Sequence, residues 1–426
     1  MALGLWTLPV ATTGAAFGLG WWLKRRGLDP RLLTSLLQTS LRSVPALDQE
    51  IHVLLCVADH YEPKHGPAPM RVARARVEKW VCDYPRNLGE FCDSDGRPPR
   101  HSFFYPVEDY EPEILDALAE LCRQGYGEVE VHLHHDNDCA DRLRRVLLDY
   151  KHLLADQHGL LARHRESGEL AYGFIHGNWA LCNSHPEGHW CSVNEEIDVL
   201  RETGCYADFT MPSAPHPTQT RTINRIYYAT NRAGKAKSHD TGQDVGAGPV
   251  PMRSLMLIQG PLALNWRQRK LGLVPRLENG CLQASQPPSL QRLGRWLQAA
   301  VQVPTRPDWY FVKLHSHGAV ERDHHALLGA PMTDFHHALA RHAHQYPHFH
   351  YHYVTAREMY NLAKAAEAGW QGSVAAVLDY ELLWNGDCAA RLQRSPYGID
   401  LSTIGRASHS GSDAMEEHMP ARKPGA

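Results

Sequence analysis

Short apolar segments alternate with amphipathic segments along most of this chain. The segment at residues 51–58 is almost continuously apolar, as in a strand that is buried on both faces. The pattern predicts strands at residues 51–58, 101–106, 128–133, 170–175, 205–211, 255–258, 309–314 and 349–354. Amphipathic spacing predicts helices at residues 30–44, 112–123, 141–163, 197–203 and 355–366. Strands that alternate with helices predict an α/β fold built on a parallel sheet or barrel.

The segment at residues 127–138 carries the densest polar chemistry. Val129, Val131 and Leu133 alternate with polar residues, so they predict a strand with one apolar face. At and beyond its end the chain presents, within seven residues, His132, His134, His135, Asp136 and Asp138. Imidazole and carboxylate groups at this density predict a divalent metal site, with a solvated polar loop as the alternative.

Three further strand ends carry residues of the same kind. They present Asp59 and His60 after the first predicted strand, His176, Asn178 and Trp179 after the fourth, and His315 and His317 after the seventh. The carboxyl ends of parallel strands meet at one rim, so these groups are expected to converge. A hydrolytic metal site needs about three protein ligands, an open position for water, a base and an acid. The four strand ends together supply these parts.

Composition narrows the class of protein. The chain has 426 residues, 43% of them apolar, and a net charge of -3, which is typical of a folded globular protein. Without a basic surplus, nucleic acid is not expected as a partner. The 28 histidines are the compositional outlier, and although part of this excess is expected on the surface, imidazole is the commonest nitrogen ligand for metals. The ten cysteines form no C-x-x-C pair, and their scatter favours a reducing compartment. Nothing in the sequence indicates an oligomeric state.

The first residues predict membrane attachment. Residues 3–23 are uncharged and mostly apolar, and Lys24, Arg25 and Arg26 follow directly. About 20 such residues can span a bilayer as a helix. Residues 1–27 are therefore a candidate membrane anchor, with a shallowly inserted or buried helix as the alternative. The positive charges after the apolar run predict a catalytic domain in the cytoplasm, with the periplasm as the alternative.

The remaining organisation follows from pattern and composition. Residues 28–50 are expected to form a linker helix, and residues 51–370 the globular α/β domain. Residues 215–250 are rich in Pro, Gly, Asn, Lys and Thr, which predicts a long excursion over the surface. A C-terminal extension is expected at residues 371–405, and a disordered polar tail at residues 406–426.

The order of the polar motifs resembles that of the polysaccharide deacetylase (carbohydrate esterase) superfamily. An apolar strand ending in Asp59 and His60 comes first, and the Glu-Val-His-Leu-His-His run around His132 follows. Gly-Cys-Tyr-Ala-Asp, ending at Asp208, and Lys-Leu-His, ending at His315, come later. The resemblance covers residues 51–369. It implies a distorted (β/α) barrel of about seven strands and one divalent metal, most often zinc. It also implies removal of N- or O-linked acetyl groups from a polysaccharide or glycan precursor.

The resemblance also implies roles for single residues. Asp59 corresponds to the family's catalytic base and is expected to contact the metal. His60 stands where the family usually has a metal-binding aspartate. His132 matches the first histidine of the second motif, and His134 is expected to complete the ligand set. His315 corresponds to the general acid of the final motif.

The other site residues are expected on the substrate side. Asn178 and Trp179 are candidates for lining a sugar-binding cleft, although a tryptophan beside a strand is as often part of the core. The resemblance places Asp208 near the substrate, and His317 lies beside the general acid in sequence. His135 and Asp136 are the alternatives to His134 as a metal ligand.

The resulting hypothesis is acetyl hydrolysis by a water that the metal activates. Asp59 would take the proton of this water, and His315 would protonate the departing amine or alkoxide. Asp59→Ala should then abolish activity without unfolding the protein. Two other functions remain open. One is an inactive, membrane-tethered protein that binds glycans or acts as a scaffold. The other is a dinuclear metallophosphoesterase, which the His176-Gly-Asn178 and His315-Ser-His317 segments faintly resemble.

Overall fold

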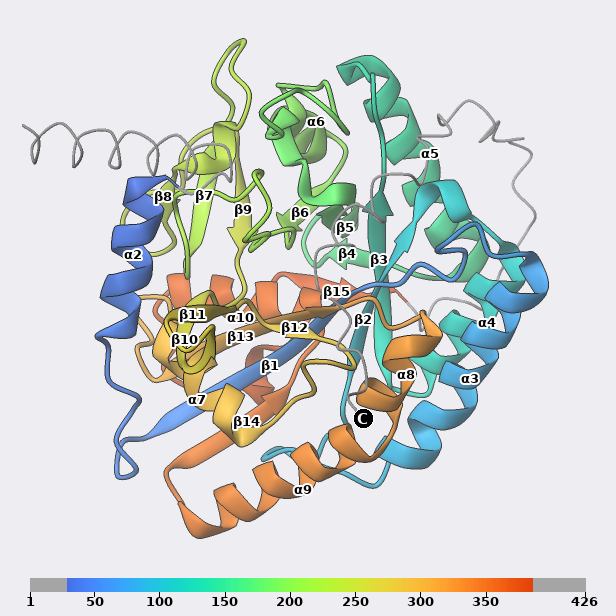
Figure 1. Ribbon diagram of the computed structural model, residues 1–426. Coiled ribbons are helices and arrows are strands. Elements are labelled where there is room, and N and C mark those ends of the chain that lie inside the picture. Colours follow the sequence, from blue (N-terminus) through green and yellow to red (C-terminus); the bar gives the residue numbers. More distant parts are fainter. Residues whose placement is uncertain (1–28, 386–426) are drawn as a thin grey trace, which may run out of the picture.

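The computed structural model describes residues 29–385, and in it parallel strands alternate with helices as the pattern predicts (Figure 1). The central strands are β1 (Ile51–His60), β2 (His101–Pro106), β3 (Gly127–Leu133), β5 (Leu170–His176), β6 (Cys205–Asp208), β9 (Ser254–Ile258), β13 (Trp309–Ser316) and β14 (Phe349–Tyr353). The shorter or peripheral strands are β4 (Ala162–His164), β7 (Ile226–Thr230), β8 (Gln243–Asp244), β10 (Ala263–Lys270), β11 (Val274–Glu278), β12 (Cys281–Leu282) and β15 (Leu382–Trp384). The α-helices are α2 (Pro30–Ser40), α3 (Met70–Leu88), α4 (Pro112–Arg123), α5 (Ala140–His158), α6 (Glu196–Glu202), α7 (Leu290–Ala299), α8 (Glu321–Leu328), α9 (Ala330–Gln345) and α10 (Ala356–Glu367).

The main sheet is mixed, and most of it is parallel. Its strand order is β12-β13-β1-β2-β3-β5-β6-β9-β7-β8, and only β7 and β8 run antiparallel to their neighbours in this path. The first half of β1 also pairs with β14. The two ends of the path, β12 and β8, are not paired with each other, so a closed barrel is not confirmed. The protein is an α/β protein with a mixed sheet.

The sheet nevertheless curls strongly, so that β9 approaches β13. Gly260, just after β9, lies so close to β13 that a Cβ atom there would stand 2.4 Å from the carbonyl oxygen of Lys313. The buried Lys313 ammonium donates to the carbonyl oxygens of Phe209 (2.6 Å) and Met211 (2.8 Å), which follow β6. The Lys313 side chain therefore connects β13 to the segment after β6, although these two parts of the sheet are not paired as strands.

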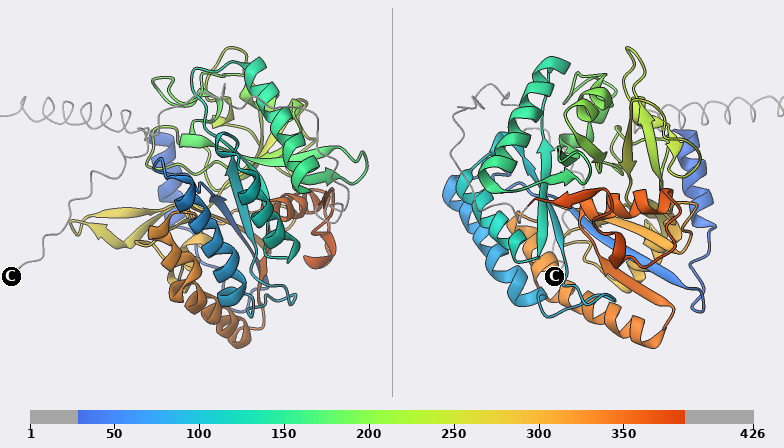
Figure 2. Two further views of the ribbon diagram at one scale, coloured as in Figure 1. Left: turned by 90° about the vertical axis from the view of Figure 1, so that its right-hand side faces the viewer. Right: turned by 180° about the vertical axis from the view of Figure 1, so that it is seen from behind.

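Helices cover the two faces of the sheet unequally. The convex face packs on α3 to α9 and holds the larger apolar cluster, which includes Val53 from β1, Trp80 from α3 and Leu147 from α5. The concave face holds a second cluster, in which Leu54 from β1 meets Met359 from α10. The right-hand view of Figure 2, seen from behind, shows α10 in front of the sheet, and the left-hand view shows the β10–β11 hairpin projecting from the body. Alternate residues of β1 thus enter different cores.

A charged network lies among the buried groups at the start of α10. The Arg357 guanidinium makes two hydrogen bonds to Glu128 of β3, at 2.8 and 3.0 Å, and only 2% of Arg357 is exposed. Arg97 and Arg100 both bind Glu358. Burial raises the pKa of Glu358, but the guanidinium groups of Arg100, Arg97 and Arg357 outweigh it and lower this pKa to about 2. The network joins the first turn of α10 to β3, the strand that leads into the histidine-rich segment.

Several segments differ from the sequence-based expectation. Helix α5 ends at His158 rather than residue 163, because Gly159 takes the left-handed conformation (φ 68°) that ends a helix. Residues 215–250 contain β7 and β8 of the main sheet, where a surface excursion was expected. Within the expected extension, β15 pairs with β4. The candidate anchor at residues 1–27 and the expected tail at residues 406–426 lie outside the described residues. Among residues 29–385, no helix is both long and apolar enough to cross a bilayer.

Candidate functional site

Histidines from three strand ends lie side by side at the carboxyl rim of the sheet. The ring centroids of His60 and His132 are 4.9 Å apart, and those of His60 and His317 are also 4.9 Å apart. His315 is slightly farther, at 6.5 Å from His60. These residues come from β1, β3, and β13 with the loop that follows it, because parallel strands deliver their carboxyl ends to one edge. Residues remote in the sequence therefore share one site.

The group best suited to a metal is formed by His60, Glu62 and His132. One ligand atom from each lies within 4.8 Å of the others, and all three residues are buried. Glu62 Oε1 is 3.2 Å from His132 Nε2. His132 Nδ1 donates to the carbonyl oxygen of Ile175 (2.8 Å), which leaves Nε2 free to face the group. A backbone acceptor on the far nitrogen is the usual way in which a metal-binding histidine is oriented.

The remaining residues around Glu62 fix its orientation. His65 Nδ1 lies 3.0 Å from Glu62 Oε2. His134 Nε2 lies 3.6 Å from Glu62 Oε1, while His134 Nδ1 lies 2.5 Å from Glu108 Oε1. Burial lowers the pKa of His134, but the adjacent Glu108 carboxylate outweighs burial and raises the pKa to about 9. His134 thus sits against the group, and its other nitrogen is held by Glu108.

Asp59 points away from this group. Its Oδ1 accepts the backbone N–H of Gly318 (2.7 Å), and its Oδ2 lies 2.9 Å from His101 Nε2. The side chain is completely buried. A Cβ atom at Gly318 would stand 2.3 Å from Asp59 Oδ2 and 2.6 Å from the ring of Trp80, so only glycine fits there. Asp59 fastens the loop that carries His317, and this contrasts with its expected role as base and metal ligand.

This geometry predicts different outcomes for two Asp59 variants. Asp59→Ala leaves the Gly318 N–H buried without an acceptor, and we expect about 2–3 kcal/mol less stability in urea denaturation. Asp59→Asn keeps one carbonyl oxygen for Gly318 and is expected to cost about 1 kcal/mol or less. We also expect Asp59→Asn to retain activity within about tenfold. A folded Asp59→Asn protein with no activity would instead restore the catalytic-base role.

His315 and His317 differ in how they reach the site. His315 is buried, its Nδ1 has no hydrogen-bond partner among the described residues, and burial and the nearby Lys313 lower its pKa well below the usual range. His317 is partly exposed, and its pKa is lowered by burial, although the Glu62 and Asp59 carboxylates oppose this. Since His317 is the more exposed of the two, it has the better access to a bound substrate.

An aromatic wall borders the histidines. Trp179 is half-buried, with its ring centroid 5.9 Å from that of His60 and 5.7 Å from that of His216. Trp190 lies 5.7 Å beyond His216 and 4.7 Å from His185. The row of rings runs from the metal-ligand candidates through the buried His216 to Trp190, and both tryptophans are partly exposed. Such a row suits the flat apolar faces of sugar rings.

The other two expected substrate residues have different surroundings. Asn178 is partly exposed and precedes Trp179, and both have left-handed backbone conformations (φ 53°). Asp208 is buried and accepts hydrogen bonds from the side chain (2.7 Å) and backbone (3.1 Å) of Thr210. Burial raises the pKa of Asp208 to about 7. Asp208 thus supports the turn after β6, and its position does not favour the expected contact with substrate.

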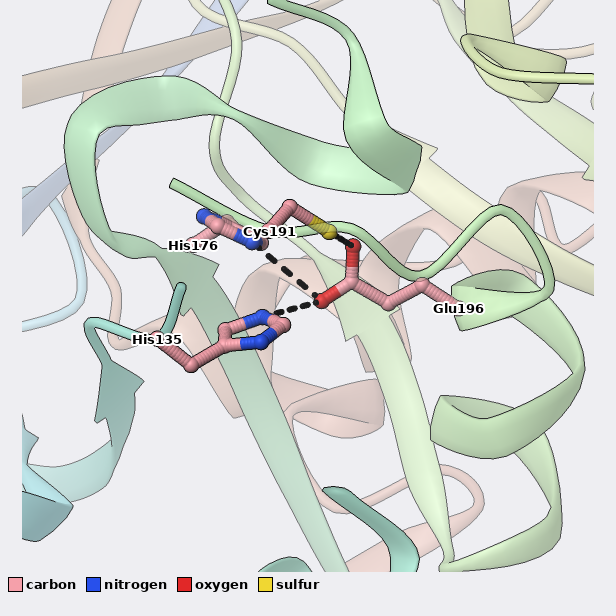
Figure 3. A group of neighbouring side chains, drawn as sticks. All are labelled: His135, His176, Cys191 and Glu196. Atoms are coloured by element: carbon pink, nitrogen blue, oxygen red, sulfur yellow. Dashed lines mark hydrogen bonds and ion pairs between the residues drawn. The ribbon is translucent and has the colours of Figure 1, made fainter. Parts of the chain in front are cut away.

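A second group of possible ligands lies beyond the first and was not expected from the sequence. His135, His176 and Cys191 surround Glu196, and all four residues are buried (Figure 3). His134 and His135 are neighbours in the chain, but they face different groups. Asp136, the other alternative ligand, instead accepts the backbone N–H of Trp190 (2.9 Å). The described residues therefore contain two separate buried groups near one rim.

The sequence pattern did contain a signal for one overlooked residue. Glu62 follows His60 by two positions, and residues at this spacing lie on the same side of an extended chain. No such signal exists for Cys191 and Glu196, because they come from an irregular loop and the start of α6. No protein-family model matches the chain, and no curated protein matches it significantly.

Proposed function

We propose that this protein is a metal-dependent hydrolase that removes acetyl groups, N- or O-linked, from a glycan. The observation that carries the proposal is the buried group of His60, Glu62 and His132 at the rim, beside the half-buried Trp179. Two imidazoles and a carboxylate are a typical ligand set for a catalytic zinc ion, which keeps a further position open. The motif order that resembles polysaccharide deacetylases supports the acetyl specificity, and the curled sheet is then interpreted as the distorted barrel of that superfamily.

Different residues of the site would hold the metal, position its ligands, transfer protons and bind the sugar. A zinc ion held here would supply Lewis acidity and activate water at neutral pH. His60, Glu62 and His132 would hold it, and His65 and Glu108 would keep Glu62 and His134 in place. His317 would transfer protons, since it is partly exposed and lies next to His60. His315 remains an alternative proton donor to the departing amine or alkoxide. Trp179 would stack on the sugar ring.

Acetate release from defined substrates tests this function. The purified full chain would be freed of metal, reloaded with zinc, and incubated with a panel of N-acetylated oligosaccharides and O-acetylated glycans. We expect zinc-dependent acetate release from at least one of these classes. Phosphate monoesters and diesters form the control panel. Zinc-dependent phosphate release without acetate release would overturn the proposal.

Two other functions are less well supported. A dinuclear phosphoesterase requires two ions about 3.5–4 Å apart, usually with shared ligands, whereas the two buried groups share no residue. An inactive glycan-binding protein would bind the same sugars without releasing acetate. Membrane attachment through residues 1–27, with the domain on the cytoplasmic side, belongs to the present proposal and is tested by cell fractionation of the full chain.

A further inference from the structure

We propose that His135, His176, Cys191 and Glu196 form a second, structural zinc site that fastens the loop between β5 and α6. The four side chains come from four segments: the end of the histidine-rich segment, the end of β5, the loop itself, and the first residue of α6. Figure 3 shows the other three side chains directed at the Glu196 carboxylate. This site is distinct from the group of His60, Glu62 and His132.

One ligand atom from each of the four residues lies within 4.8 Å of the others, close enough for all four to bind a single ion. Glu196 Oε1 is 3.1 Å from His135 Nε2 and 3.4 Å from His176 Nε2, and Glu196 Oε2 is 3.5 Å from Cys191 Sγ. In a tetrahedral zinc site with bonds of about 2.0–2.3 Å, neighbouring ligand atoms are separated by about 3.3–3.8 Å. Two nitrogens, one sulfur and one oxygen are also a donor set that suits zinc.

Both histidines are oriented as metal ligands are. His176 Nδ1 donates to the carbonyl oxygen of Gly177 (2.5 Å), so its Nε2 is the free nitrogen. That Nε2 is buried and has no hydrogen-bond partner among residues 29–385. His135 Nδ1 makes no hydrogen bond among the described residues, but the Asp138 carboxylate lies beside it, with Oδ2 at 3.1 Å, and Asp138 in turn binds Arg142. A carboxylate or carbonyl behind each imidazole is the usual support of a metal-binding histidine.

The cysteine and the carboxylate are supported in the same way. Cys191 Sγ accepts the backbone N–H groups of Asn183 (3.3 Å) and Val193 (3.4 Å), which suits a thiolate. Glu196 Oε2 also accepts the backbone N–H of Cys182 (2.6 Å). Every ligand candidate is at most 4% exposed. A site with four buried protein ligands is of the structural kind, whereas the group at His60 offers three and leaves a position open.

The loop needs such a support. Residues 177–195 contain only two short 3₁₀ turns, and six non-glycine residues in this loop have left-handed backbone conformations (φ 52° to 73°): Asn178, Trp179, Cys182, Asn183, Trp190 and Ser192. Left-handed conformations are unfavourable for such residues and persist where the surroundings enforce them. The loop carries both tryptophans of the aromatic wall. The zinc site would thus set the position of that wall, but its existence does not depend on the hydrolase activity.

Metal content and cobalt spectroscopy test the site in the full chain. Wild-type protein purified from zinc-containing medium should hold two zinc ions per chain. Cys191→Ser and His176→Gln should each lose the ion of the second site and keep that of the first, whereas His132→Gln should show the reverse. With cobalt in place of zinc, wild-type protein and His132→Gln should show a near-ultraviolet thiolate-to-cobalt charge-transfer band, and Cys191→Ser should lack it.

An exposed neighbouring cysteine provides the matched control. Cys139→Ser removes a thiol just before α5 and should keep both the metal content and the band. If Cys191→Ser fails to fold, the cobalt spectrum of wild-type protein, with Cys139→Ser beside it, decides the matter, because the group at His60 contains no cysteine. Absence of the band at full cobalt loading, or an unchanged metal content in folded Cys191→Ser, would overturn the site and leave the four residues as a buried ion-pair cluster.

Discussion

Replacing His132 by glutamine is expected to lower the rate of acetate release about 10³-fold and to remove the zinc ion of the first group. His132 Nε2 faces Glu62 at 3.2 Å, and its far nitrogen is committed to the backbone. Glutamine fills the space but offers no imidazole nitrogen. A metal ion contributes several kcal/mol to stabilising the charge of the transition state, and each 1.36 kcal/mol is a factor of ten in rate. Acetate release and elemental analysis measure the two losses.

His134→Gln is the matched control for this variant. His134 comes from the same segment, but one of its nitrogens is engaged by Glu108. We therefore expect His134→Gln to keep the zinc and to lose about 10–100-fold in rate, as is usual for residues that support a ligand. Trp179→Ala should keep the zinc as well and raise KM about tenfold through lost stacking, which corresponds to about 1.4 kcal/mol. An active His132→Gln protein would remove the first group from the mechanism.

The largest loss of stability is expected from Arg357→Met. Arg357 and Glu128 are both buried and joined by two hydrogen bonds, so the variant removes both bonds and leaves Glu128 with the more distant Arg100, at 3.7 Å, as its remaining ion pair. Breaking a buried pair in this way costs about 3–5 kcal/mol. The free energy of unfolding, measured by urea denaturation, should fall by this amount.

Two further variants test whether the loss of stability comes from breaking a buried ion pair. The double variant Glu128→Met/Arg357→Met removes both charges and should recover much of the stability, since a well-packed apolar pair is often as stable as an ion pair. Arg144→Ala removes a surface arginine that pairs with Asp141 and Glu202, and should cost about 1 kcal/mol or less. Equal losses in Arg144→Ala and Arg357→Met would show that burial of the pair is not the cause.

The strands were the most predictable part of the fold. Those around residues 51–58 and 309–314 are mostly apolar segments, and the structure has them as β1 and β13. Strands such as β7 and β10 were not predicted. The residues of β7 (Ile226–Thr230) favour a strand, but they lie within the segment 215–250 that is rich in Pro, Gly, Asn, Lys and Thr, whereas β10 (Ala263–Lys270) is mostly polar. Whether such segments form strands depends on their partner strands and on packing, and the hydrophobic period of the sequence alone does not reveal either.

The candidate site was predictable only as far as strand ends determine it. His60, His132 and His315 meet because parallel strands share a rim, and this is readable from the sequence. The direction of each side chain is not readable in the same way. Asp59 and His60 are adjacent, yet they face opposite sides of β1. His60 therefore lies with Glu62 and His132, whereas Asp59 accepts the backbone N–H of Gly318. Adjacent residues on a strand cannot both point into one site.

The opposed directions of His134 and His135 have a consequence for engineering and for natural variation. A single inserted or deleted residue between His132 and His135 would change the spacing of these two histidines, which belong to different groups, so the two groups could not both keep their ligands in place. Protein engineers who transplant the candidate site would need to move residues 132–138 and 176–196 together, along with the end of β1 and the residues after it that carry His60 and Glu62. For the same reason, natural variation in length is expected to avoid these two stretches and to accumulate in the projecting β10–β11 hairpin.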